Sequence, residues 1–90
     1  MMPAKAITDI HAPQIYHSVI LPMWVLYKNP TDFPEKYVLR LWDGATNTPR
    51  STVFLADTEQ EIEFEIKRFN RFVRLERFEN DDPKIMAVFV

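Results

Sequence analysis

Apolar and polar positions divide the chain into five stretches that predict β-strands: residues 23–28, 36–42, 51–56, 73–78 and 84–90. Residues 36–42 show a period of two most clearly, because every second side chain is a tyrosine or a leucine. Residues 84–90 are apolar on both faces, which is typical of a strand that lies inside a sheet. The turns between these strands are rich in Pro, Asn and Asp, since the chain has seven prolines and one glycine.

Residues 57–69 combine two conflicting periodicities. The middle of this segment alternates apolar and acidic residues, and that alternation taken alone predicts a strand. A helix is favoured because Asp57 with Gln60, and Thr58 with Glu61, have the spacing of a capping box. An apolar stripe at helical spacing also favours it, formed by Ile62, Ile66, Phe69 and Val73. Acidic residues in front and basic residues behind suit the helix dipole, so we predict a helix.

The element order β-β-β-α-β-β predicts an α+β domain, with a mainly antiparallel sheet of about five strands and one helix packed on one face. In the register that we expect, Tyr27 and Tyr37 lie together in the core. The opposite face then carries a candidate protein interface formed by Trp24, Leu26, Val38 and Trp42. Such an apolar face needs cover from the N-terminal segment, from a second copy of the chain or from another protein. The apolar residues of the N-terminal segment are Ile7, Ile10, Ile15, Tyr16 and Val19.

Composition and charge exclude several classes of protein. The chain has 90 residues, enough for one domain, and its net charge of −2 argues against a generally basic nucleic-acid-binding protein. It contains no cysteine, which excludes disulfides, thiol catalysis and cysteine metal sites. The longest apolar run, residues 19–27, is interrupted by Pro22 and is too short to span a bilayer. We therefore expect a small soluble domain, cytoplasmic and without membrane contact.

Candidate chemistry is sparse. His11 and His17 are six residues apart around Pro13, a spacing that does not fit two metal ligands on one helix, and no further His or Cys ligands exist. Ser18 adjoins His17, but neighbouring side chains diverge and no glycine-rich turn provides an oxyanion hole. The carboxylates are clustered on the predicted helix and in a turn rather than across a cleft. We therefore expect no enzymatic activity, no cofactor and no bound metal.

A basic run between residues 67 and 77 is interleaved with phenylalanines, a mixture that also occurs in single-strand nucleic-acid binders. Its members are Lys67, Arg68, Arg71, Arg74 and Arg77. Lys67, Arg68 and Arg71 are favourable near the C-terminal end of a helix, and the phenylalanines are typical of a core. Together with the acidic overall balance, these simpler explanations make nucleic-acid binding the alternative hypothesis rather than the leading one.

From Met23 onward the order of short motifs resembles a family of short bacterial proteins of uncharacterised function. The motifs are M-W-V-L-Y-K-N-P at 23–30, D-F-P at 32–34, A-D-T at 56–58 and D-D-P at 81–83. The resemblance implies a helix after the A-D-T step and implies no activity. Relatives have Pro and Gly after this helix, where residues 70–72 read N-R-F, so the helix is expected to run further here. Relatives begin near Met23, so we expect residues 1–22 to be an N-terminal extension and residues 23–90 to be a single α+β domain.

These observations favour a small protein-binding or regulatory module without catalysis, which docks through a sheet face. Its partner is an unidentified protein or a second copy of the chain. The alternatives are a nucleic-acid-binding protein that uses the basic run, and a phage-type inhibitor of a host protein. Salt separates the first two, because binding to phosphates weakens steeply with salt and an apolar contact does not.

Overall fold

A computed structural model describes residues 5–68, 72–76 and 84–90 of this protein. The elements in chain order are β1 (Lys5–Ile7), the 3-10 helix η1 (Pro13–Tyr16), β2 (Pro22–Lys28), β3 (Tyr37–Asp43), β4 (Thr48–Ala56), α1 (Glu59–Lys67), β5 (Arg74–Glu76) and β6 (Ile85–Phe89). Each strand expected from the alternation is therefore present in the described part of the chain. Residues 77 and 78, at the end of the predicted strand 73–78, lie outside the described residues.

The six strands form one mixed sheet in the order β1-β4-β3-β2-β6-β5. The α+β class with one helix is confirmed, and β6 lies inside the sheet as its apolar pattern predicts. The sheet differs in detail from the expected five antiparallel strands, because β1 adds a sixth and runs parallel to β4. Three residues are too few to show a period of two, so the sequence pattern does not indicate β1.

The helix forms where the capping box predicts it. Thr58 is the N-cap, its hydroxyl accepts the N–H of Glu61 at 3.3 Å, and the carboxylate of Glu61 accepts the N–H of Thr58 at 3.0 Å. Ile62 and Ile66 are buried against the sheet. The stripe does not continue to Val73, which lies beyond the helix and is 63% exposed, and Phe69 lies outside the described residues.

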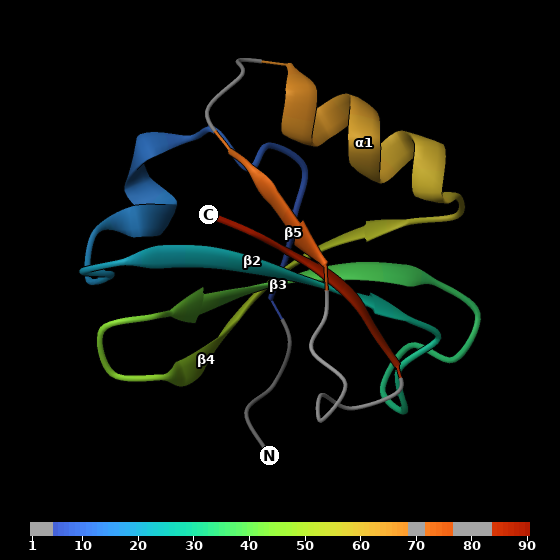
Figure 1. Ribbon diagram of the computed structural model, residues 1–90, viewed down its shortest axis with the longest axis horizontal. Coiled ribbons are helices and arrows are strands. Elements are labelled where there is room, and N and C mark those ends of the chain that lie inside the picture. The colour runs from blue at the N-terminus through green and yellow to red at the C-terminus, as the bar shows by residue number, and fades with distance from the viewer. Residues whose placement is uncertain (1–4, 69–71, 77–83) are drawn as a thin grey trace.

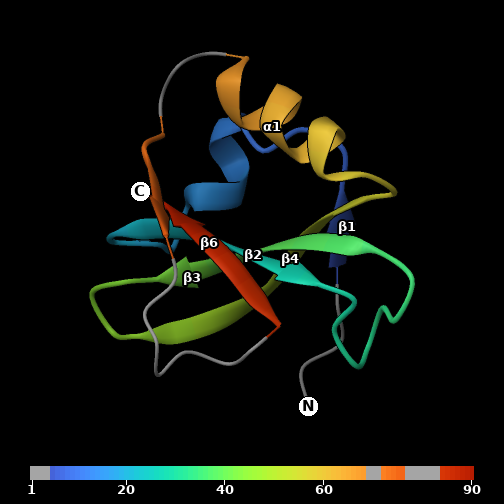
Figure 2. The same cartoon turned by 45° about the vertical axis from the view of Figure 1, so that its right-hand side comes forward.

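Helix α1 and η1 lie on the same side of the sheet (Figures 1 and 2). The main core lies between them and the strands, and the N-terminal segment contributes Ile10, which is completely buried, to that core. Ile7, Ile15, Tyr16 and Val19 pack against it. The N-terminal segment therefore does cover a sheet face, and it covers the same face as α1.

The expected grouping of side chains by face is correct for β3 and wrong for β2. Tyr27 lies opposite Val38, and Tyr37 lies opposite Lys28, so β2 and β3 pair one residue away from the expected register. Because side chains alternate between faces, that shift moves every residue of one strand to the other side. Trp24 and Leu26 consequently face α1 and are completely buried in the core.

Candidate functional site

The sheet face opposite α1, called here the helix-free face, carries the side chains that alternate with the core. Val25 of β2 lies between Arg40 of β3 and Val88 of β6, and Arg40 lies beside Val53 of β4. Val25 and Val53 are buried, so the middle of this face is shielded from solvent at these residues. The hollows of this face lie beside these buried residues.

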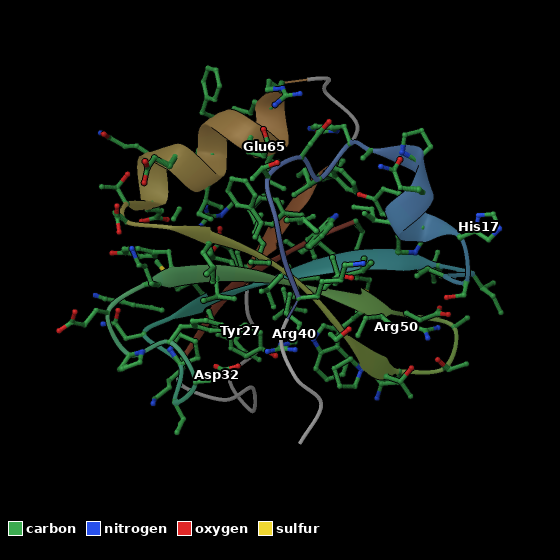
Figure 3. All side chains as sticks on the ribbon, turned by 180° about the vertical axis from the view of Figure 1, so that it is seen from behind. His17, Tyr27, Asp32, Arg40, Arg50 and Glu65 are labelled. Carbon is green, nitrogen blue, oxygen red and sulfur yellow. The ribbon has the colours of Figure 1, made fainter. Side chains whose placement is uncertain are left out.

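One hollow of this face is a pocket of about 290 Å³, called here the Trp42 pocket. It is lined by Tyr27, Pro30, Asp32, Val38, Arg40, Trp42 and Pro49. A smaller hollow of about 160 Å³ lies on the other side of Trp42, against Met23 and Val88. The Trp42 indole therefore separates two pockets on the helix-free face. Figure 3 shows Tyr27, Asp32 and Arg40 close together at this side of the sheet.

Arg40 holds the wall of the Trp42 pocket together. Its Nη2 donates to Oδ2 of Asp32 at 2.8 Å, and its Nη1 donates to the carbonyl of Arg50 at 2.9 Å. That carbonyl lies in an irregular part of β4, where the pairing jumps between Arg40 and Trp42. Such bulges leave main-chain groups without a ladder partner, and Arg40 supplies the missing donor. The guanidinium is therefore used within the protein.

The two tryptophans differ in the hydrogen bonding of their indole N–H groups. Nε1 of Trp24 donates to the hydroxyl of Tyr16 at 2.9 Å, and the two rings meet edge to face. Nε1 of Trp42 is buried and has no hydrogen-bond partner among the residues that the structure describes. A buried donor left unpaired costs about 1–3 kcal/mol.

The structure divides the predicted interface residues between two environments. Val38 and Trp42 line the Trp42 pocket, whereas Trp24 and Leu26 belong to the core beneath α1 and the N-terminal segment. Sequence reasoning missed Tyr27 as a pocket residue, because it assigned β2 to the wrong face. It also missed Arg40, although the alternation of β3 puts Arg40 on the same face as Val38 and Trp42, because only apolar side chains were considered for an interface. It also missed Asp32, whose place in the loop between these strands gave no signal of a contact with Arg40.

The described members of the basic run are paired with carboxylates. Lys67 lies 3.7 Å from Glu63, and Arg68 donates to Glu65 at 2.8 Å. Arg74 contacts Glu63 and lies 3.5 Å from Glu59 and 3.0 Å from Glu76. Arg71 and Arg77 lie outside the described residues. The described members of the run therefore form part of an ion-pair network around α1.

The two histidines have different surroundings, and Figure 3 shows His17 at the end of η1. His11 is buried, and its Nε2 donates to the main-chain carbonyl of Glu65 at 2.7 Å, which fastens the N-terminal segment to α1. His17 is exposed after η1. Within residues 5–68, 72–76 and 84–90, no group of three His, Cys, Asp or Glu side chains is placed to hold a metal ion.

Asp43 is the most strongly perturbed carboxylate. It is 1% exposed, and its oxygens accept the N–H groups of Ile20, Leu21 and Ala45 at 3.0–3.1 Å and Nη2 of Arg50 at 3.2 Å. The N–H of Ile20 contributes most to lowering the pKa of Asp43 to about 2, while burial acts in the opposite direction. Asp43 ties the start of β2 to the turn between β3 and β4, and this structural role accounts for its burial.

The chain matches no protein-family model, no curated protein sequence and no solved structure. In the described part of the chain, no helix has the length and apolar character needed to cross a membrane.

Proposed function

We propose that this protein is a small binding module without catalytic activity, which docks a partner protein at the Trp42 pocket. The observation that supports the proposal is the pocket of about 290 Å³ on the helix-free face, with aromatic, proline and valine walls. Pockets of this character bind an apolar or aromatic side chain and use a few polar groups to orient it. We infer that the occupant turns the Trp42 indole, whose buried N–H has no partner among the described residues, and that this N–H then serves as such a group.

The chemistry of the pocket favours a protein partner over nucleic acid. Its one cation, Arg40, is paired with Asp32 and with a main-chain carbonyl, so the pocket offers little charge to a phosphate. The alternative surface, the basic run, has its described members next to carboxylates. No observation therefore favours nucleic-acid binding as a second function.

Affinity capture with matched variants tests this function. Tagged wild-type protein, Trp42→Phe and Pro30→Glu are incubated with lysate of the source organism, in nuclease-treated and untreated halves, and captured proteins are identified by mass spectrometry. Trp42→Phe keeps a ring in place and removes the N–H, and Pro30→Glu puts a charge at the pocket wall. We expect one stoichiometric protein that survives nuclease and is lost or strongly reduced with both variants.

Phe64→Ser provides the control, because Phe64 is 71% exposed on α1, on the other side of the sheet. This variant should capture the same protein as the wild type. Circular dichroism checks that all three variants fold. A captured protein that is insensitive to both pocket variants, or enrichment that disappears with nuclease, contradicts docking at the Trp42 pocket.

A further inference from the structure

Exposed apolar side chains gather along one edge of the sheet. Among the described residues, Val73, Leu75 and Val90 are 63%, 47% and 43% exposed. They are neighbours, because Val73 and Val90 exchange main-chain hydrogen bonds of 2.8 and 3.0 Å and Leu75 pairs with Val88. An apolar edge of this kind offers unpaired main-chain groups to another strand.

This edge is formed by β5, the outermost strand of the sheet beside β6. Its inner side pairs with β6, and no strand in the described part of the chain pairs with its outer side. Arg74 points toward α1, where it contacts Glu63 and lies over the ring of Phe89 at 5.8 Å. Leu75 consequently points to the helix-free side, and β5 is held on its inner edge by β6 while its outer edge pairs with none of the described strands.

We propose that a second copy of this chain pairs antiparallel along the outer edge of β5, about a twofold axis through Leu75. In this register Arg74 of one copy lies opposite Glu76 of the other, and the two Leu75 side chains meet on the helix-free side. The sequence of β5, R-L-E, is thus complementary in charge to its own reverse. Parallel pairing in register would place Arg74 against Arg74 and Glu76 against Glu76, which is unfavourable.

The geometry suits a homodimer because a twofold interface presents the same patch from both copies. Glu76 is 75% exposed at its side chain, so it has room to contact the second Arg74 while its own contact is kept. The pairing joins the two sheets into one continuous sheet. This inference goes beyond the proposed function, since the Trp42 pocket lies over β2, β3 and β4 and stays open in the dimer.

Sedimentation equilibrium over a wide concentration range tests the proposal. The wild type should show a monomer–dimer equilibrium. Leu75→Lys places two cations side by side at the axis, and Glu76→Arg places arginines opposite one another. Each should weaken association by roughly tenfold or more, since like charges directly opposite destabilise a strand pair. Trp42→Phe should leave association unchanged, which separates this result from the test of the pocket.

A cysteine variant tests the register, because the natural chain contains no cysteine. Leu75→Cys should form a disulfide-linked dimer on mild oxidation, since residues directly opposite in an antiparallel pair lie close enough for a disulfide. Phe64→Cys, at an α1 residue that is 71% exposed against 47% for Leu75, should not do so at the same rate. A monomeric wild type at all concentrations, a dimer insensitive to both charge variants, or equal cross-linking of the two cysteine variants would overturn the proposal.

Discussion

At the scale of single residues, the free energy of unfolding depends on a few buried polar groups. Asp43, 1% exposed, joins three main-chain N–H groups and Arg50 into one cluster. A buried carboxylate is tolerated when its oxygens are fully hydrogen-bonded, as they are here. Gly44 follows it because a Cβ at this position would come within 3.1–3.3 Å of Leu21 and Met23 atoms.

The low pKa of Asp43 predicts how stability depends on pH. The pKa falls from 3.8 to about 2 on folding, so the folded state favours the ionised carboxylate. Its contribution is present above about pH 4 and is lost as pH falls from about 4 toward 2. Asp43→Asn should be less stable than the wild type at pH 7, and the difference should shrink across this range.

Urea unfolding of both proteins at a series of pH values measures this difference. Arg50 is ionised throughout the range, so the change in the difference reports on the carboxylate. An equal loss of stability in wild type and variant between pH 4 and pH 2 would assign the acid sensitivity to other groups.

At the scale of elements, α1 is specified largely by its own sequence. The capping box, acidic residues in the first turn and a lysine in the last turn all lie within Asp57–Lys67. These local contacts decide between helix and strand in a segment whose alternation favours a strand. The N-cap residue carries much of that preference, because it satisfies main-chain N–H groups that the helix leaves unpaired.

Replacement of this N-cap should therefore be costly. Thr58→Ala should lower the free energy of unfolding by about 1 kcal/mol, since the Glu61 N–H loses its acceptor. Thr31→Ala, at an exposed turn position, is the matched control and should change stability by less than about 0.5 kcal/mol. Guanidinium titration followed by far-UV circular dichroism measures both. Equal effects at the two positions would mean that the cap does not stabilise α1.

At the scale of the whole molecule, the N-terminal segment and α1 form one layer over the sheet. Ile10 is completely buried, its N–H donates to Oε2 of Glu65 at 3.2 Å, and its carbonyl accepts from Tyr16. Arg68 in turn holds Glu65 at 2.8 Å and lies 3.5 Å from Asp9. Residues far apart in sequence thus share one partly buried polar cluster, which fixes the segment on the core.

Ile10 and Ile20 of this segment provide a matched pair of substitutions, one in the core and one on the surface. Ile10→Ala should lower the free energy of unfolding by about 2–5 kcal/mol, because it removes buried methylenes and leaves a cavity. Ile20→Ala should have an effect near zero, since Ile20 is 77% exposed. Thermal unfolding with calorimetry compares the two. Similar values for both variants would show that the segment contributes no core to the folded state in solution.

The candidate site was less predictable than the fold. Val38 and Trp42 follow from the alternation of β3 alone, and both line the pocket. Trp24 lies in the core and Tyr27 on the helix-free face, which is the reverse of the prediction. The alternation along β2 is compatible with either of its faces pointing toward the core. The register is decided by the turn at Asn29, where φ is 51°, and by the contacts that Trp24 makes with Tyr16.

The sequence by itself determined the α+β class, the helix and the approximate positions of the longer strands, because capping and alternation act between residues close in the chain. Tertiary structure decided which face each strand buries, where the N-terminal segment packs and how β1 joins the sheet. It also decided that Arg40 and Asp32 meet beside Trp42. These features depend on contacts between distant segments, and a pattern with a period of two is unchanged when a strand moves by one residue and its faces exchange.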